Sequence, residues 1–389
     1  MTVWTAIRGA LYLVALVPIA YSLAAALIGQ EFFFGRKRTA SASEPPPVEF
    51  TPSISILKPI RGLDRETYEN YASFCRQDYP EFEILFCVTD DSDPAVPVIK
   101  QIVRDFPERR IRLLAGAEPL GASDKVNKLC RMAREARHEL LIVSDSDVRV
   151  EPGFLRAIAE PFRDPAVGGV TCLYRGLTNG SLAAELEALG NSTDFAPGVL
   201  VAWALGGEKL DFMLGAVMAT TKEHLAEIGG FEALVDYFCD DYELGNRLAA
   251  RGRVELSRFP VDIVYPRETL GEAFRHQIRW NLSIRYSQPW GHLGLVFAQW
   301  VPWAALLAAC VSWRAGVGYL AIALLLRIPS AAIIGLHGMK DRRALTHFWW
   351  LLFRDPFAFV VWLASFFPQR IHWRDRKFRV REKRLVPSD

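Results

Sequence analysis

The segment that most constrains the fold is an apolar run that leads directly into two aspartates. Residues 140–144 read LLIVS and are followed by Asp145, Ser146 and Asp147. A short run of this kind is typical of a central strand in a parallel sheet, because helices cover both of its faces. Open α/β sheets bind their ligands at the carboxyl ends of their strands. The run therefore predicts a buried strand with two carboxylates at the ligand-binding edge of a sheet.

The Asp-x-Asp spacing has two interpretations. Two carboxylates at positions i and i+2 can direct their oxygens at one hard cation. Mg²⁺ or Mn²⁺ bound by carboxylates and substrate phosphates is the usual arrangement in phosphate chemistry. An Asp- and Ser-rich surface turn is the alternative, since both residue types favour turns. The rest of the chain has to decide between a metal site and a turn.

Residues 53–265 alternate between short apolar segments and segments of helical periodicity. This alternation predicts an α/β fold with βαβ units and a mainly parallel sheet. Right-handed crossovers would bring Lys58, Asp90 and Asp145 to one edge of that sheet. The expected strands cover residues 53–60, 83–89, 111–114, 140–144 and 167–174. The expected helices cover residues 68–76, 96–106, 125–136, 181–205 and 240–251, and the helix over 181–205 is expected to break near Pro197-Gly198.

An apolar run at residues 9–29 has the length of a membrane-spanning helix, for which about 20 residues are needed. A signal peptide is the competing interpretation, but no small-residue cleavage site follows the run. We therefore expect an N-terminal membrane helix over residues 1–35. Basic residues 36–38 come next and place the following domain in the cytoplasm by the positive-inside rule. Residues 36–52 are rich in Ser and Pro and predict a linker to a catalytic domain over residues 53–270.

The C-terminal third also predicts membrane association. Residues 271–290 favour a basic amphipathic helix at the membrane interface, and residues 291–368 contain three further apolar runs. The basic residues 369–389 predict a cytoplasmic tail. Three full crossings would put this tail outside, so one run is expected not to cross. We choose residues 345–367, because Arg354-Asp355-Pro356 interrupts them; Arg354 and Asp355 would form an ion pair or line an acceptor tunnel.

Composition excludes several classes. The chain has 389 residues, of which 51% are hydrophobic, and a net charge of +2 that gives no reason to expect a nucleic-acid partner. Its six cysteines form no C-x-x-C pair, which favours reduced thiols over disulfides or a zinc site. No G-x-G-x-x-G follows the first expected strand, so a dinucleotide-dependent oxidoreductase is not favoured.

Taken in order, the motifs resemble one family. They are Ser55-Ile56-Leu57-Lys58-Pro59, Cys87-Val88-Thr89-Asp90, Asp145-Ser146-Asp147, Asp240-Asp241 and His276-Gln277-Ile278-Arg279-Trp280. This series is similar to the membrane-bound, inverting ceramide glucosyltransferases and to related bacterial enzymes that glycosylate hopanoids. The resemblance covers nearly the whole chain. It implies a nucleotide-sugar-binding fold of the GT-A type, a UDP-sugar donor, a lipid acceptor and a place in the membrane, with a bacterial inner membrane favoured and the catalytic domain on the cytoplasmic face.

The resemblance also implies a role for each motif. Asp241 would be the general base that takes a proton from the acceptor hydroxyl, as a single displacement requires. Asp145 and Asp147 would hold Mg²⁺ or Mn²⁺. The nucleotide sugar would contact Lys58, Pro59, Asp90, Lys125, Asp145 and Arg279, and the sugar and acceptor pocket would include Asp240, His276, Gln277 and Trp280. His276 stands where the wider family has Gln or Arg, whereas related bacterial sequences carry His.

Alternatives within and outside this chemistry remain open. The donor could carry an N-acetylhexosamine, and the acceptor could be a hopanoid or diacylglycerol instead of ceramide. A processive polysaccharide synthase would need more than four apolar runs for its channel. A catalytically silent, nucleotide-binding membrane scaffold would have no need for both Asp147 and Asp241.

Overall fold

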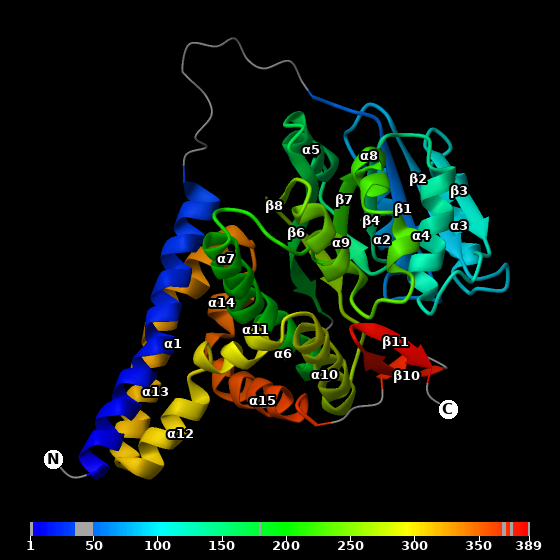
Figure 1. Cartoon of the computed structure of the whole chain (residues 1–389). Coiled ribbons are helices and arrows are strands. Elements are labelled where there is room, and N and C mark those ends of the chain that lie inside the picture. Colours follow the sequence, from blue (N-terminus) through cyan, green and yellow to red (C-terminus); the bar gives the residue numbers. More distant parts are fainter. Residues whose placement is uncertain (1–2, 36–49, 179, 368–370, 374–375, 388–389) are drawn as a thin grey trace, which may run out of the picture. The chain divides into compact units, whose positions relative to one another are not determined.

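The computed structural model describes residues 3–35, 50–178, 180–367, 371–373 and 376–387, and these divide into two compact units (Figure 1). One unit consists of residues 1–36, 180–204 and 268–369, and the other consists of residues 37–179, 205–267 and 370–389. Following the sequence predictions, they are called the membrane unit and the catalytic unit. The following paragraphs describe each unit by itself.

The catalytic unit contains an eight-stranded mixed sheet with the order β3-β2-β1-β4-β7-β6-β8-β5. Parallel pairing joins β3, β2, β1 and β4, and also joins β6 to β8, whereas β7 and β5 run in the opposite direction. The α/β fold with a mainly parallel sheet is thus confirmed. The strands are β1 (Ile54–Pro59), β2 (Phe82–Val88), β3 (Arg110–Ala115), β4 (Leu140–Ser144), β5 (Val148–Arg149), β6 (Val167–Leu177), β7 (Val217–Thr221) and β8 (Arg253–Val264).

Helices connect these strands and cover the sheet, so that β2 and β4 are buried along their whole length. This burial explains why the sequence of β4 is entirely apolar up to its terminal serine. The helices of this unit are α2 (Thr67–Cys75), α3 (Val96–Asp105), α4 (Asp124–Glu135), α5 (Phe154–Ala159), α8 (Lys222–Glu227) and α9 (Asp240–Ala249), with 3-10 turns at Glu160–Arg163 and Phe231–Leu234.

The basic C-terminal segment is part of the catalytic unit. We expected a tail, whereas the structure has a three-stranded antiparallel sheet of β9 (Ile371–Trp373), β10 (Arg376–Arg381) and β11 (Arg384–Pro387). Glu382 and Lys383 form the two-residue turn between β10 and β11 and have φ angles of 50° and 65°. Positive φ at both turn residues matches the twist of a tight hairpin, which the charged composition did not predict.

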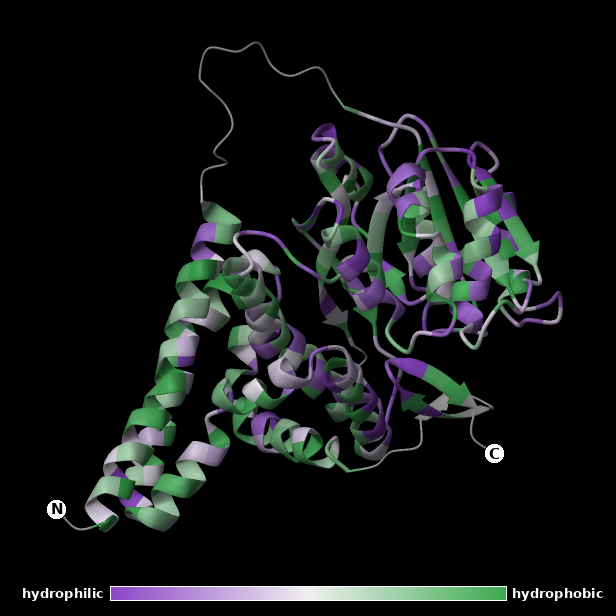
Figure 2. Ribbon diagram, viewed as in Figure 1, coloured by the Kyte–Doolittle hydropathy of each residue, from purple (hydrophilic) through white to green (hydrophobic). Residues whose placement is uncertain are grey.

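The membrane unit is helical. Its elements are α1 (Val3–Phe34), α6 (Leu182–Gly190), the π-helix η2 (Asn191–Phe195), α7 (Ala196–Leu205), α10 (Leu270–Ser287), α11 (Pro289–Gly294), α12 (Val301–Cys310), α13 (Trp313–Ser330), the π-helix η5 (Ala331–Gly338), α14 (Arg343–Thr346) and α15 (Leu351–Ala364), with 3-10 turns at Leu295–Phe297 and Phe348–Trp350. Apolar residues run along α1, α12 and α13 (Figure 2).

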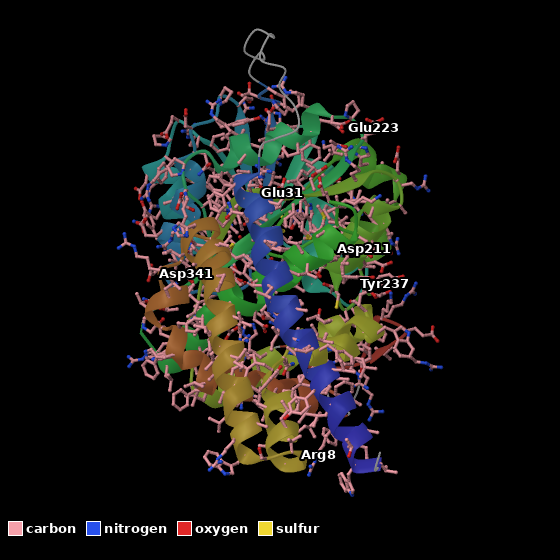
Figure 3. All side chains as sticks on the ribbon, turned by 90° about the vertical axis from the view of Figure 1, so that its left-hand side faces the viewer. Arg8, Glu31, Asp211, Glu223, Tyr237 and Asp341 are labelled. Carbon is pink, nitrogen blue, oxygen red and sulfur yellow. The ribbon has the colours of Figure 1, made fainter. Side chains whose placement is uncertain are left out.

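Two helical stretches among the described residues, Val3–Phe34 and Trp313–Gly338, are long and apolar enough to cross a membrane. The pair Pro289–Phe297 and Val301–Cys310, bent by 53°, would be a third if it counts as one span. The charged side chains of α1, Arg8 and Glu31, lie near its two ends (Figure 3). At 14 residues, α15 is shorter than the stretch that spans a bilayer. The direction of each crossing stays a prediction.

Two further features of the membrane unit differ from expectation. Residues 181–204, placed in the catalytic domain from the sequence, pack with the membrane helices instead. They form an almost continuous helix whose irregularity is the π-helix at Asn191–Phe195, and helical geometry continues through Pro197 and Gly198. Pro197 lies just after this π-helix, where the backbone already departs from i→i−4 bonding because the Ala196 N–H donates to the Asn191 oxygen, so the N–H that proline lacks is tolerated there. The expected linker falls mostly outside the described residues.

Candidate active site

The site is built on the carboxyl ends of β1 and β4, which are paired in parallel with Leu57 opposite Val143. Lys58 projects from β1, is completely buried, and donates from Nζ to Ser144 Oγ at 3.2 Å and to the backbone oxygen of Asp145 at 2.9 Å. Burial lowers the pKa of Lys58 to about 7, against the opposing effect of Asp145 and Asp147. These bonds hold the end of β4, so the structure gives Lys58 a role in fixing the Asp-x-Asp segment.

Asp145 and Asp147 follow β4 and concentrate negative charge at this edge. Burial, reinforced by Asp145 and Asp64, raises the pKa of Asp147 to about 7. A half-buried carboxylate beside further carboxylates is stabilised by a cation, and oxygen ligands of this type suit Mg²⁺ or Mn²⁺. The residues present therefore fit a divalent metal ion.

Lys125 joins the Asp-x-Asp segment to the second acidic pair. Ser123 caps α4, accepting a hydrogen bond at Oγ from the Val126 N–H at 3.4 Å, and thereby places Lys125 in the first turn. Lys125 Nζ lies 2.7 Å from Asp145 Oδ1 and 3.6 Å from Asp240 Oδ2. Burial would lower the pKa of Lys125, but these two carboxylates outweigh it and raise the pKa well above the usual range. The sequence placed Lys125 near a nucleotide and did not anticipate this bridge.

Asp240 and Asp241 form the first turn of α9. Asp241 Oδ1 accepts a hydrogen bond from the N–H of Tyr242 at 2.8 Å. Burial and the neighbouring Asp240 raise the pKa of Asp241 to about 6. Such a value suits a general base, because the carboxylate is still ionised near neutral pH and is more basic than a solvated one.

Gly215 shows that the two acidic segments border the same small space. A Cβ at Gly215 would lie 3.0 Å from Asp241 Oδ2 and 3.8 Å from Asp145 Oδ2. The turn that contains Gly215 is tied to the strand end, because the Asp145 N–H donates to the oxygen of Ala216 at 3.3 Å. The sequence analysis missed Gly215. Its only local signal is its position, since it lies just before an apolar strand.

The segment that leads into Asp240 is held from two sides. On one side, the Ser123 N–H donates to the Val235 oxygen at 2.8 Å and the Ala122 N–H donates to Asp236 Oδ1 at 3.0 Å. On the other side is the β10–β11 hairpin. The Leu385 N–H donates to the Asp236 oxygen at 2.8 Å, and the Phe238 N–H donates to the Lys383 oxygen at 3.0 Å. The acidic pair is therefore positioned by parts of the chain that are far away in sequence.

Aromatic contacts reinforce this hairpin contact. Lys383 Nζ lies 5.3 Å from the centre of the Tyr242 ring, next to Asp241 in the chain. The guanidinium of Arg384 lies 5.3 Å from the centre of the Tyr237 ring, a residue labelled in Figure 3. Cation–π contacts of this kind contribute about 0.5–1 kcal/mol each at exposed sites.

Two other predicted residues lie at strand ends without joining this group of carboxylates. Asp90 follows β2, is exposed, and accepts hydrogen bonds at Oδ1 from the N–H and the hydroxyl of Ser92, which lower its pKa. Pro59 ends β1 opposite Cys87. The structure adds Lys128, a buried residue that donates from Nζ to the Ile60 oxygen at 2.8 Å and to Thr89 Oγ1 at 2.9 Å. It ties the ends of β1 and β2 together.

The remaining predicted residues lie on α10 in the membrane unit. The ring of His276 contacts that of Trp280 in a tilted arrangement, with 4.6 Å between centroids and 57° between the ring planes. His276 Nδ1 lies 3.0 Å from Glu187 Oε1 on α6. The Gln277 backbone oxygen accepts a hydrogen bond from Asn281 Nδ2 at 3.0 Å. Arg279 is on the same helix. Glu268, just before α10, has a pKa that burial raises, against the effect of His276.

The charges within the C-terminal apolar runs are paired. Arg354 donates to Asp355 Oδ1 at 3.1 Å and to Asp194 Oδ2 at 2.9 Å. Asp355 also contacts Arg327 and accepts from the Trp300 indole N–H at 2.7 Å. The expected ion pair is present and belongs to a larger buried network. Unpaired charges at these positions would be costly in a membrane.

Comparisons with known proteins agree with this geometry. A model of the family described as glycosyl transferase family 21 matches residues 10–386. Ceramide glucosyltransferase 1 of Caenorhabditis elegans is 30% identical over 222 residues, which are 57% of this chain and 47% of that protein. Ceramide glucosyltransferase 3 of the same organism is 31% identical over 204 residues, which are 52% of this chain and 43% of that protein. The match thus spans about half the length of these relatives.

The fold is also similar to that of solved glycosyltransferase structures. One of them is a mannosyltransferase from Pyrobaculum calidifontis in complex with GDP-Man and Mn²⁺, with a TM-score of 0.51 and 15% sequence identity. The similarity covers 91% of this chain and 99% of that chain. At this identity the likeness shows the fold alone.

Proposed function

Since the chain belongs to glycosyl transferase family 21, we propose that it transfers a sugar from a nucleotide-diphosphate donor to a hydroxyl of a membrane lipid. The observation that carries the proposal is the bridge from Asp145 through Lys125 to Asp240. It joins a pair of carboxylates suited to a metal–diphosphate complex to the pair that contains the proposed base. The two long apolar helices support a lipid acceptor.

In this proposal Asp145 and Asp147 would hold a divalent cation beside the diphosphate of the sugar donor. Mg²⁺ or Mn²⁺ would neutralise charge that develops on the departing diphosphate. Lys125 keeps Asp145 in place and adds a fixed positive charge beside it. The Lys58 bonds to Ser144 and to the Asp145 backbone hold the strand end, so the carboxylates need not reorganise during the reaction.

Asp241 is the proposed general base. It removes the proton from the acceptor hydroxyl while that oxygen forms a bond to the anomeric carbon. The bond from this carbon to the diphosphate oxygen breaks in the same displacement, and the nucleoside diphosphate leaves with the electron pair. The configuration at the anomeric carbon is therefore inverted. The raised pKa of Asp241 supports this role, since a more basic carboxylate takes the proton more readily.

The other residues have proposed roles that rest on the sequence. Asp90 and Pro59 would contact the nucleotide, and Arg279 would meet the diphosphate. Asp240, His276, Gln277 and Trp280 would border the sugar and the acceptor. These roles follow from the family motifs, and the contact between the His276 and Trp280 rings supports a shared surface on α10.

Glucose from a UDP-sugar and ceramide are the proposed substrates. The names of the two relatives support this choice. A hopanoid or diacylglycerol acceptor and an N-acetylhexosamine donor are the alternatives. We further propose that the catalytic unit faces the cytoplasm, most simply of a bacterial inner membrane, because Arg36-Lys37-Arg38 follow α1.

The test uses the purified full chain in lipid nanodiscs with UDP-glucose, Mg²⁺ or Mn²⁺, and ceramide, diacylglycerol or a hopanoid. We expect a metal-dependent glycolipid product of inverted anomeric configuration with ceramide. Asp241→Asn should reduce kcat by several orders of magnitude while UDP still binds, and Asp147→Asn should abolish the response to metal. Asp211→Asn, at an exposed aspartate of the same unit, is the matched control. Full turnover by folded Asp241→Asn protein would disprove the assignment of the base.

A further inference from the structure

We propose that Glu187, Glu268 and His276 form a second metal site in the membrane unit, selective for a transition-metal ion such as Zn²⁺ or Mn²⁺. Glu187 lies on α6, Glu268 immediately precedes α10, and His276 lies in the second turn of α10. One ligand atom from each residue lies within 4.8 Å of the others. Three such atoms at this separation can surround one ion, and the proposal does not depend on the reaction assigned to the chain.

The burial of Glu187 is the second observation that points to a ligand. Its exposed fraction is 3%, and neither carboxylate oxygen receives a hydrogen bond from the residues that the structure describes. The partner of Oε1 is the ring of His276, at 3.0 Å from Nδ1, which itself belongs to the cluster. Removing a carboxylate from water without hydrogen bonds is costly, and a second carboxylate nearby increases the cost. A divalent cation among the three groups would offset both effects.

Local structure holds the three ligands in place. Thr269 and Glu272 form a capping box at the start of α10, with the Glu272 N–H donating to Thr269 Oγ1 at 3.3 Å. This box fixes the first turn between Glu268 and His276. The Trp280 ring, one turn further along α10, packs against the His276 ring and restricts its orientation. A preformed set of ligands loses little conformational entropy on binding.

The ligand types predict which metal binds. An imidazole nitrogen with two carboxylate oxygens suits Zn²⁺, Mn²⁺ or Fe²⁺, whereas Mg²⁺ prefers oxygen ligands and water. The Asp145–Asp147 pair has oxygen ligands alone. The two sites should therefore differ in selectivity, and a metal at the cluster would tie α6 to α10 as a structural crosslink between the two helices.

The experiment separates the two sites by mutation. The test uses the full chain with Asp145→Asn and Asp147→Asn, from which bound metal has been removed by a chelator. Calorimetric titration of this chain with Zn²⁺ should give one saturable site per chain. Adding Glu187→Gln or His276→Asn should abolish that site. Adding Glu185→Gln is the matched control, because Glu185 lies on the same helix and faces Arg343 instead. X-ray absorption at the zinc edge should show Zn²⁺ bound by both nitrogen and oxygen ligands.

A second measurement leaves Glu187, Glu268 and His276 unchanged, so its result does not depend on whether variants of these residues fold. The thermal midpoint of the Asp145→Asn/Asp147→Asn chain should fall on addition of a chelator and recover with Zn²⁺, since a ligand that binds the folded state stabilises it. Mg²⁺ should not restore it. The proposal is overturned if Zn²⁺ and Mn²⁺ give no saturable binding to this chain. It is equally overturned if ¹⁵N NMR shows that metal leaves the His276 ring unchanged, because the cluster is then a histidine–carboxylate ion pair.

Discussion

The position of Asp241 can be perturbed by one methyl group. In Gly215→Ala, the added Cβ would lie 3.0 Å from Asp241 Oδ2, which is tighter than ordinary van der Waals contact. The carboxylate would have to move by a few tenths of an ångström. A misplacement of 1 Å costs roughly a hundredfold in rate, so we expect kcat to fall about tenfold. This corresponds to about 1.4 kcal/mol of lost transition-state stabilisation.

The same substitution should not destabilise the protein. Gly215 does not have a positive φ, and the nearest neighbours of the added carbon are side-chain atoms of Asp241 and Asp145. Replacing glycine by alanine at a compatible backbone position stabilises by about 0.4–1 kcal/mol, because the unfolded chain loses freedom. We therefore expect an unchanged or slightly higher thermal midpoint together with a lower kcat.

The assay is steady-state turnover with saturating UDP-glucose, lipid acceptor and metal. Gly168→Ala is the matched control in the same sheet, because the nearest neighbour of its added Cβ lies at an ordinary 3.5 Å. The control should keep its kcat. If folded Gly215→Ala protein also keeps the parent kcat, the reasoning that ties turnover to the position of Asp241 is refuted.

Three other expectations follow from the same structure. Lys383→Ala removes the cation beside the Tyr242 ring and should lower kcat a few-fold without changing the KM for UDP-glucose. Glu382→Ala, at the neighbouring turn residue, is the control and should leave kcat unchanged. Equal kcat values for the two variants would contradict a positioning role for the hairpin. Gly245→Ala places a methyl group 2.2 Å from a backbone nitrogen and should cost about 1–3 kcal/mol in the free energy of unfolding, seen as a lower thermal midpoint. The pKa of Asp241 is raised to about 6 in the ligand-free chain, and the base must be ionised. We therefore expect kcat/KM to be level at higher pH and to fall as pH drops through that value. A profile of kcat/KM that stays flat at acidic pH argues against this base.

Much of the catalytic unit could be predicted from the sequence because its signals are local. Strand and helix periodicity located β1 to β4 and their helices to within a few residues, and β4 agrees at both ends. The order of strands and helices implied a parallel sheet, and chain direction then placed Lys58, Asp90 and Asp145 at strand ends. The family resemblance was equally accessible, since it depends on motifs in a fixed order.

The relations that build the site depend instead on contacts between distant segments. Lys125 lies in a polar helix turn whose sequence does not reveal which carboxylates it will meet, and in the structure it bridges Asp145 and Asp240. The basic C-terminal residues suggest a solvated tail, yet their backbone pairs with the segment before Asp240. Many charged residues in a segment indicate that its side chains are exposed to solvent. They do not indicate which backbone groups it will pair with, because that depends on where the fold places the two segments.

The membrane unit likewise has features that the sequence predicts and features that only tertiary packing decides. Apolar length alone identified α1 and the C-terminal membrane helices, because the cost of exposing polar groups in a bilayer acts on every residue of a span. The length of apolar runs did not assign residues 181–204 to the membrane unit, and it did not predict the contact between Glu187 and His276. A sequence by itself determines which segments must be buried and which residue types follow them. The partner of each buried charge was decided by tertiary packing, because a desolvated charge requires a specific neighbour and many sequence positions could supply one.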